Sequence, residues 1–141
     1  MLAGLPGSGK DTYIRRHLSD LTVVSIDDPQ RAHGVAPTDK KGTGRMVQLA
    51  KEAARVPLRA GRDFVFNATN LTAMMRRHWV GLFTEYGAGV RLIYLEVPYR
   101  ELLRRNGARA HPVPVGVLGR MIGGLQVPVV GEGLGVDIFV A

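Results

Sequence analysis

Short β-branched or apolar runs alternate along the chain with longer segments in which apolar residues recur every three or four positions. Runs of the first kind predict strands, and segments of the second kind predict amphipathic helices. We expect strands at residues 1–3, 21–26, 63–67, 90–95 and 136–140, and helices at residues 10–19, 43–60, 72–86, 98–109 and 114–125. Strands that alternate with helices form βαβ units. The predicted fold class is therefore α/β, with a central parallel five-stranded sheet flanked by helices.

The segment at residues 72–86 has the clearest helical pattern. Thr72 can cap its first turn, and Gly87 can end it. Its apolar stripe is made of Met75, Trp79, Leu82, Phe83 and Tyr86. We expect Trp79 and the adjacent residues Met74 and Met75 to pack in the core.

Two features limit the regularity of the predicted elements. Pro57 lies within the helix expected at residues 43–60, and it should kink or end that helix because its ring removes a backbone donor. The first expected strand has only three residues before Gly4, where about five or six are usual. From the short strand we expect residues 1–141 to be a single domain that could come from a longer chain.

Composition narrows the class of protein. The chain has 141 residues, of which 45% are hydrophobic and 22% are charged, as is typical of one globular domain. It contains no Cys, which excludes disulfide scaffolds, cysteine nucleophiles and thiolate metal sites. No apolar run approaches the ~18 residues of a membrane span, and no secretory leader is recognisable. We predict a cytoplasmic protein that does not contact a membrane.

The charge favours an anionic partner. Nineteen Lys and Arg residues against twelve Asp and Glu residues give a formal net charge of +7. Such an excess is typical of proteins that bind nucleic acid or nucleotides. Arg outnumbers Lys by fifteen to four. Guanidinium groups suit bidentate phosphate binding, although a GC-rich coding bias produces the same ratio.

Residues 4–10 match the first part of the Walker A pattern, GxxxxGK. The segment follows an expected strand and begins an expected helix, so its backbone N–H groups and the positive helix end would surround phosphates. Lys10 would bridge the β- and γ-phosphates of ATP. The predicted ATP-binding residues are Gly4, Leu5, Pro6, Gly7, Ser8, Gly9, Lys10, Asp11 and Thr12, together with Arg105 and Arg109.

The position after Lys10 departs from the usual pattern. Asp11 stands where a Ser or Thr usually holds Mg²⁺, and Thr12 follows it. Loops similar to that of adenylate kinase also place their Thr second. We expect Thr12 to contact the α-phosphate and Asp11 to reach Mg²⁺, directly or through water.

The second expected strand runs into Asp27 and Asp28. Ligands collect at the carboxyl ends of parallel strands, so these carboxylates would face the phosphate loop. A carboxylate there can accept the proton of an attacking hydroxyl. The alternative is a turn, because Asp-Asp-Pro is favourable turn chemistry.

The third expected strand ends at Asn67, where a Walker B acid is usual, and no acid is present there. Asn67, Thr69 and Asn70 could bind substrate or the waters of Mg²⁺, or they could close a turn. Further along, Arg105 and Arg109 would share one helix face at a spacing of four. Two guanidinium groups on one face suit the charge of a transferring phosphoryl group, and a solvated basic face is the alternative.

These motifs together resemble the P-loop kinase domain of polynucleotide 5′-kinases, which phosphorylate 5′-hydroxyl ends of RNA or DNA. The similarity spans residues 4–121, and its most specific parts are Val97-Pro98-Tyr99, Arg105-Asn106-x-x-Arg109 and Val113-Pro114. Phage kinase–phosphatases and bacterial RNA end-healing proteins contain such domains. The resemblance implies an ATP- and Mg²⁺-dependent kinase with a lid at about residues 100–125.

The resemblance also implies individual roles. Lys10 and Thr12 would bind ATP phosphates, Asp27 would be the general base, and Arg105 and Arg109 would clamp the transferred phosphate. The predicted substrate-binding residues are Asp27, Asp28, Arg31, Asn67, Thr69 and Asn70. Relatives are often fused to a phosphatase, phosphohydrolase or ligase that acts in nucleic-acid end repair, and these are the expected partner activities.

One family position differs in this chain. An Arg that contacts the acceptor phosphate often follows the base by three residues, and Gln30 stands there with Arg31 next to it. Arg31 could replace it, Asp28 rather than Asp27 could be the base, or acceptor binding could be weaker. Two other functions stay open: a small-molecule kinase of the same fold, and a nucleotide- or RNA-binding module with little catalysis.

Overall fold

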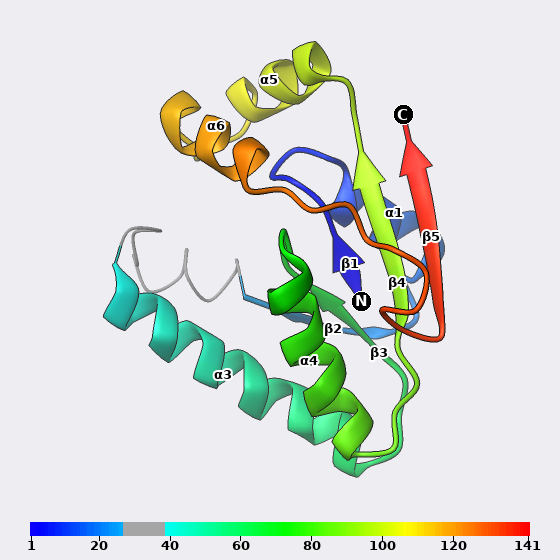
Figure 1. Cartoon of the computed structure of the whole chain (residues 1–141). Coiled ribbons are helices and arrows are strands. Elements are labelled where there is room, and N and C mark those ends of the chain that lie inside the picture. Colours follow the sequence, from blue (N-terminus) through cyan, green and yellow to red (C-terminus); the bar gives the residue numbers. More distant parts are fainter. Residues whose placement is uncertain (27–38) are drawn as a thin grey trace.

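A parallel sheet forms the centre of the molecule. The computed structural model describes residues 1–26 and 39–141. Within them the strands are β1 (Leu2–Ala3), β2 (Thr22–Ser25), β3 (Phe64–Asn67), β4 (Arg91–Glu96) and β5 (Gly135–Val140). They lie in the order β2-β3-β1-β4-β5, and each neighbouring pair is parallel (Figure 1). The predicted α/β class and parallel five-stranded sheet are confirmed.

Helices cover both faces of the sheet and its carboxyl edge. The described helices are α1 (Lys10–His17), α3 (Lys40–Arg59), α4 (Ala73–Glu85), α5 (Tyr99–Gly107) and α6 (Val115–Gly123). Figure 1 shows α3 and α4 on one face, α1 on the other, and α5 and α6 beyond the carboxyl ends of the strands. No helix in the described ranges is long and apolar enough to span a membrane.

The alternation of side chains along β3 assigns each residue to one face. Phe64 and Phe66 pack toward α3 and α4, while Val65 packs toward α1. Successive side chains of a strand point to opposite faces, so Asn67 shares the α1 face with Val65. The polar end of β3 is therefore directed toward the first turn of α1.

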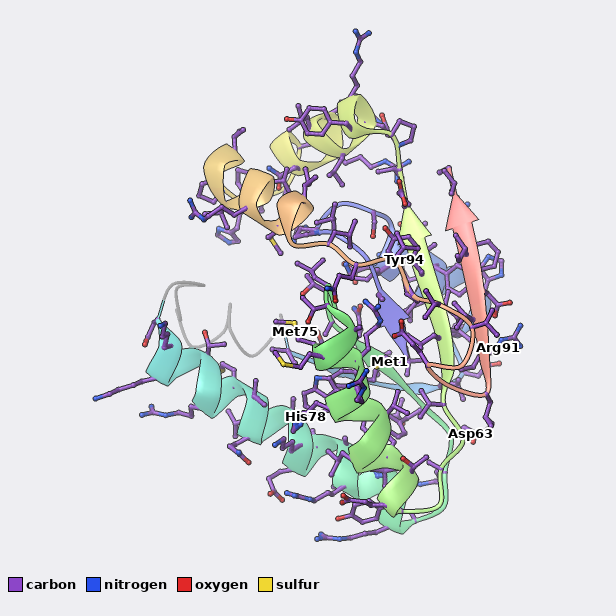
Figure 2. All side chains as sticks on the ribbon, viewed as in Figure 1. Met1, Asp63, Met75, His78, Arg91 and Tyr94 are labelled. Atoms are coloured by element: carbon purple, nitrogen blue, oxygen red, sulfur yellow. The ribbon has the colours of Figure 1, made fainter. Side chains whose placement is uncertain are left out.

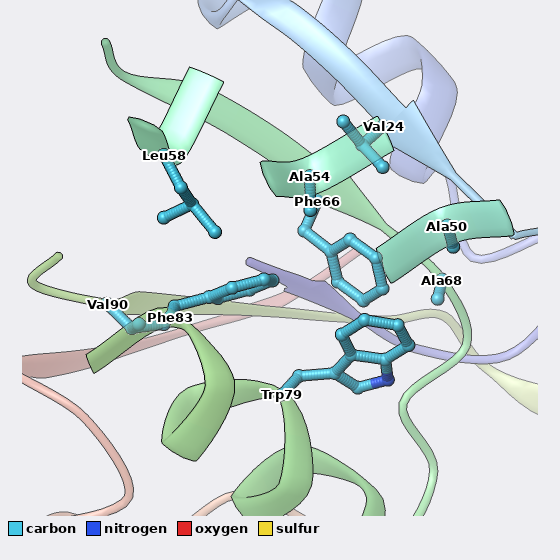
Figure 3. Packing of buried hydrophobic residues seen from close by; sticks show 9 residues of the cluster. All are labelled: Val24, Ala50, Ala54, Leu58, Phe66, Ala68, Trp79, Phe83 and Val90. Atoms are coloured by element: carbon cyan, nitrogen blue, oxygen red, sulfur yellow. The ribbon is translucent and has the colours of Figure 1, made fainter. Parts of the chain in front are cut away.

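The largest core cluster lies under α3 and α4. Phe66 packs against Trp79 and Phe83, with ring centroids 4.3 and 5.4 Å apart. Ala50, Ala54 and Leu58 complete the α3 side of this cluster (Figure 3). Burial of these aromatic rings dominates the packing of this face. The predicted core position of Trp79 is confirmed.

The prediction for Met74 and Met75 was wrong. Their exposed fractions are 75% and 49%, and Figure 2 shows Met75 projecting from the first turn of α4 instead of packing on the strands. The buried position in that turn belongs to Arg76, which is 1% exposed and paired with Glu132. Helical periodicity predicted that Met75 would be the buried residue of this turn. The ion pair between Arg76 and the distant Glu132 buries Arg76 instead.

Helix α3 starts earlier than expected and runs past its proline. The carboxylate of Asp39 accepts hydrogen bonds from the N–H groups of Lys41 and Gly42, each at 3.0 Å, which caps the helix at its start. Pro57 lies inside the last turn, and the helix ends only at Arg59. So close to the C-terminus the missing donor removes one helical hydrogen bond, and Pro57 does not end the helix.

Candidate active site

The loop between β1 and α1 has the backbone shape that its glycines allow. Gly4, Gly7 and Gly9 have φ angles of 143°, 89° and 102°. These values lie in the region that L side chains rarely adopt. A Cβ at Gly4 would also clash with the carbonyl oxygen of Leu95 on β4. The glycines of the Walker A pattern are thus required by backbone conformation and by close packing against the sheet.

Lys10 closes this loop from the helix side. It is 7% exposed, and its Nζ donates to the carbonyl oxygens of Gly4 at 2.8 Å and Leu5 at 3.1 Å. The ammonium group therefore lies within the loop that the sequence assigns to phosphate binding. At the back of the loop, Leu5 packs with Leu102 of α5 and Leu118 of α6.

A cavity of about 740 Å³ opens over this loop. Among the predicted site residues it brings together Pro6, Gly7, Ser8, Gly9, Lys10, Asp11, Thr12, Asn67, Arg105 and Arg109. The lining also includes Arg15, Arg16, His17 and His111, which sequence reasoning missed. Asp11 is the one acidic side chain among the lining residues of the described ranges. This arrangement of cations around a glycine-rich loop suits a polyphosphate.

The end of β3 meets the start of α1 at one contact. Nδ2 of Asn67 donates to Oδ1 of Asp11 at 2.9 Å. Asn67 is 6% exposed, and among the described residues its Oδ1 has no hydrogen-bond partner. Oγ of Ser8 is buried without a partner in the same sense. Buried polar atoms are normally satisfied, so these oxygens are positioned to meet a bound group or water.

Ser25 is a further candidate, to which the sequence analysis gave no role. It is the last residue of β2 and pairs in register with Asn67 on β3. Its Oγ is buried, lines the cavity and has no partner among the described residues. The available signal was its position directly before Ile26 and Asp27, at the carboxyl end of a parallel strand.

Arg105 lies over the phosphate loop. Its Nη1 would stand 3.4 Å from a Cβ built on Gly9, and its own Cβ would stand 3.6 Å from one built on Gly7. Its Nε donates to Oε1 of Glu101 at 2.5 Å. Hydrogen bonds from Arg104 and Arg105 lower the pKa of Glu101 to about 2. Glu101 therefore orients Arg105 toward the loop while remaining ionised.

Arg109 reaches the same cavity from outside the helix. We predicted that Arg105 and Arg109 share one face of a helix that extends to residue 109, and this was wrong because α5 ends at Gly107. The N–H of Arg109 donates to the carbonyl of Asn106 at 3.2 Å in the turn that follows. Both arginines nevertheless line the cavity.

Asn106 holds the turn that carries Arg109. Its Nδ2 donates to the carbonyl of Val113 at 2.8 Å, and its Oδ1 accepts from the N–H of Val113 at 3.0 Å. Asn106 is 4% exposed. The paired bonds close residues 107–112 into a loop, which explains why Asn stands between Arg105 and Arg109.

Thr69 and Asn70 support the fold beside the site. Neither lines the cavity over the phosphate loop. Nδ2 of Asn70 donates to the carbonyl of Leu2 at 2.6 Å, and the carbonyl of Thr69 accepts from the N–H of Gly4 at 2.9 Å. These contacts close the turn after β3, which is the alternative role that the sequence left open for both residues. Asp27, Asp28, Gln30 and Arg31 lie outside the described residues.

Comparison with known proteins covers most of the chain. Residues 1–128 match the model of the AAA domain family. A protein assigned as a kinase from Chloroflexus aurantiacus superimposes with a TM-score of 0.76 at 16% identity, covering 99% of this chain and 85% of that one. A sugar kinase from Janibacter sp. superimposes with a TM-score of 0.73 at 18% identity, covering 99% and 82%.

A third solved structure overlaps a smaller part of both molecules. It is a chain of the Pnkp1/Rnl/Hen1 complex, with a TM-score of 0.67 and 22% identity, covering 80% of this chain and 39% of that chain. At these identities the three likenesses establish the fold. They agree with the parallel sheet and flanking helices described here.

Proposed function

This chain belongs to the AAA domain family and has the α/β P-loop kinase fold, and from that premise we propose that it transfers the γ-phosphoryl group of ATP to the 5′-hydroxyl end of RNA or DNA. The observation that carries this proposal is the pair Arg105 and Arg109, which both line the cavity over the phosphate loop. Asn106 fixes their turn through Val113, within the motif that resembles polynucleotide 5′-kinases.

The donor side of the site fits a nucleoside triphosphate. Lys10 and the N–H groups of the loop meet the phosphates, while Arg105 and Arg109 approach them from the lid. A cavity of about 740 Å³ is within the usual range for a ligand of nucleotide size. Fixed positive groups aimed at a transferring phosphoryl group stabilise its charge, and this effect supplies most of the rate in phosphoryl transfer.

The acceptor side of the proposal depends on the carboxyl end of β2. Ser25 lines the cavity there, and the chain continues through Ile26 to Asp27. The acceptor oxygen forms a bond to the γ-phosphorus as the bond from that phosphorus to the bridging oxygen breaks. Asp27 takes the proton of the acceptor hydroxyl, and ADP leaves. Asp28 stays the alternative base, and Arg31 would contact the acceptor.

Magnesium fits the residues of this site. When bound, Mg²⁺ supplies charge neutralisation to the β- and γ-phosphates. Asp11 and Asn67 would hold it from the protein side, because both are oxygen donors at the floor of the cavity.

The surface charge supports an extended anionic acceptor. Helix α3 carries Lys40, Lys41, Arg45, Lys51, Arg55 and Arg59. Its one acidic residue, Glu52, is paired with Arg55. A basic helix on one face of the sheet attracts a phosphate backbone, and such binding weakens steeply with added salt.

A small-molecule kinase is the second candidate. It is favoured by the likeness to a sugar kinase, which spans 99% of this chain. Such an enzyme would need a closed acceptor pocket, and it would gain nothing from a basic helix. A third function, a nucleotide- or RNA-binding module with little catalysis, would bind ATP without transferring phosphate.

The deciding experiment measures transfer of labelled γ-phosphate from ATP to a 5′-hydroxyl oligonucleotide in the presence of Mg²⁺. Asp27→Asn and its neighbour Asp28→Asn form a matched pair of variants. We expect transfer in the unmodified chain, loss in one variant and retention in the other, which identifies the base. Transfer to gluconate or another sugar, with none to the oligonucleotide, would contradict the proposal. ATP binding without transfer to any acceptor would also contradict the proposal, and it would support the third function, a binding module with little catalysis.

A further inference from the structure

Helix α1 and strand β3 have exchanged the residue types that usually hold Mg²⁺ beside a phosphate loop. In most P-loop proteins a Ser or Thr follows the loop Lys, and an Asp ends the neighbouring strand. Here Asp11 follows Lys10, and Asn67 ends β3. The negative charge has therefore moved from the strand to the helix, and the neutral group has moved the other way.

The contact between the two residues fixes which atoms face the cavity. An ionised carboxylate can only accept, so the amide nitrogen of Asn67 must face Asp11, as the 2.9 Å contact from Nδ2 to Oδ1 requires. Oδ1 of Asn67 is then left without a partner among the described residues, in a side chain that is 6% exposed. The amide thus orients the carboxylate and presents an oxygen of its own.

Two hydroxyl oxygens of the same cavity also lack hydrogen-bond partners among the described residues. Oγ of Ser8 in the loop and Oγ of Ser25 at the end of β2 are both buried without partners within the described ranges. Unsatisfied buried oxygens require an explanation such as an ion or ordered water. The described residues contain no group of three or more His, Cys, Asp or Glu side chains that could hold a metal ion by themselves.

We propose that Asp11 and Asn67 form a transposed magnesium site, in which the helix supplies the carboxylate and the strand supplies a neutral oxygen. Asp11 contacts the ion directly or through one water, and Oδ1 of Asn67 accepts from a water of the ion. Mg²⁺ prefers octahedral oxygen ligands and is usually held by one or two carboxylates together with substrate phosphates. A site with one carboxylate therefore binds the ion tightly only when a nucleotide is present.

This inference rests on the proposed kinase only as far as nucleotide binding, so its test needs no acceptor and no turnover. ADP affinity is measured by calorimetry in excess Mn²⁺ and again in EDTA, and Mn²⁺ binding is followed by the loss of the free-ion resonance signal. The ratio of the two ADP affinities gives the metal dependence. The variants are Asp11→Ser and the double exchange Asp11→Ser with Asn67→Asp.

Asp63→Asn is the matched control, because it removes a carboxylate next to the opposite end of β3 (Figure 2). We expect Asp11→Ser to lower the metal dependence tenfold or more, the double exchange to restore it to within about threefold, and Asp63→Asn to leave it unchanged. Recovery on exchange is a result that a merely structural Asp11 would not give. If Asp11→Ser does not fold, Asp11→Asn takes its place with the same expected loss.

Three results would overturn the transposed site. They are an unchanged metal dependence in the Asp11 variant, a loss that the double exchange does not restore, and ADP binding in the unmodified chain that is indifferent to Mn²⁺. Failure of the kinase proposal would give a different experimental result. A chain that binds Mn²⁺ with ADP, and loses that binding as described, supports the site even if no nucleic acid is phosphorylated.

Discussion

Two arginines, each with its Nε 2.5 Å from a glutamate oxygen, have opposite surroundings. Arg76 is 1% exposed, and its guanidinium meets both oxygens of Glu132 and the carbonyls of Asn70 and Gln126. The side chain of Arg105 is 36% exposed, and Glu101 is its one hydrogen-bond partner among the described residues. The remaining donors of Arg105 face the cavity over the phosphate loop.

The difference separates a guanidinium whose acceptors come from the protein from one that keeps donors available for a ligand. Nε, Nη1 and Nη2 of Arg76 all donate to protein acceptors, so this residue joins α4 to the segment that follows α6. Arg105 keeps donors available in a cavity lined by cations, where a phosphate would complete its hydrogen bonding. The same residue type with the same type of partner therefore has two roles, set by burial and by the number of acceptors around it.

Removal of the buried arginine should have the largest effect. Arg76→Met leaves the Glu132 carboxylate and the carbonyls of Asn70 and Gln126 without their partner, and breaking a buried pair in this way costs about 3–5 kcal/mol of unfolding free energy. Urea unfolding followed by circular dichroism measures this loss. A loss of unfolding free energy below about 1 kcal/mol in the same assay would mean that Arg76 contributes no more than an exposed arginine, and it would contradict the structural role assigned to this residue.

Removal of Arg105 should act on transfer rather than on folding. Arg105→Ala is expected to lower phosphoryl transfer about 10²- to 10³-fold, the usual loss for one donor to the transferring group. Its unfolding free energy should change by no more than about 0.5 kcal/mol. The measurement is steady-state transfer to the acceptor identified for the chain.

Arg104→Ala is the matched control for this variant. Arg104 lies on the same helix and shares Glu101, but it is 71% exposed and does not line the cavity. Equal losses of transfer in the two variants would mean that charge on α5, and not the position of Arg105, matters.

The elements near the sheet were predictable from local pattern. Strand alternation and helical periodicity placed every described strand within about two residues, and Thr72 caps α4 through its Oγ1, which accepts from the N–H of Met75 at 3.2 Å. The phosphate loop was equally predictable, because its glycines permit positive φ angles that are needed within a few consecutive residues. Local sequence contains enough information for such features.

Features that depend on distant contacts were not predictable in this way. The end of α5 is set by the side chain of Asn106, which bonds to the backbone of Val113 and takes Arg109 off the helix. The buried position in the first turn of α4 went to Arg76, because Glu132 lies close to it in space but 56 residues away along the chain. Neither partner is visible in helical periodicity, and the contact of Asp11 with Asn67 was missed for the same reason.

Loosening the turn between α5 and α6 should have an intermediate effect. Asn106→Leu leaves the N–H and carbonyl of Val113 unpaired in a partly buried place, and we expect a loss of about 1–3 kcal/mol in unfolding free energy. Asn106→Asp is the matched variant, because its carboxylate still accepts from the N–H of Val113 but no longer donates. Thermal unfolding should give a lower midpoint for both variants than for the unmodified chain, and an unchanged midpoint in either would contradict the assigned bonds.

The smallest expected effect is a change in one pKa. Hydrogen bonds from Arg104 and Arg105 hold the pKa of Glu101 at about 2 in the folded chain, below its ordinary value of 4.5. Because the folded-state pKa is lowered, the ion pairs of Glu101 stabilise the fold above pH 4.5, and this contribution is lost as the pH falls toward 2. Carbon-13 NMR of the Glu101 carboxyl carbon follows the titration directly.

The titration of Glu101 can also test whether a bound nucleotide contacts Arg105. If phosphates of ADP take the free donors of Arg105 and draw its guanidinium from Glu101, the pKa of Glu101 should rise above about 2 on ADP binding. It should stay below 4.5, because Arg104 keeps its own bonds to the carboxylate. In Arg105→Ala the pKa should already be raised, and ADP should no longer move it. A pKa that saturating ADP leaves unchanged in the unmodified chain would mean that Arg105 remains on Glu101, and that only its outer nitrogens reach the phosphates.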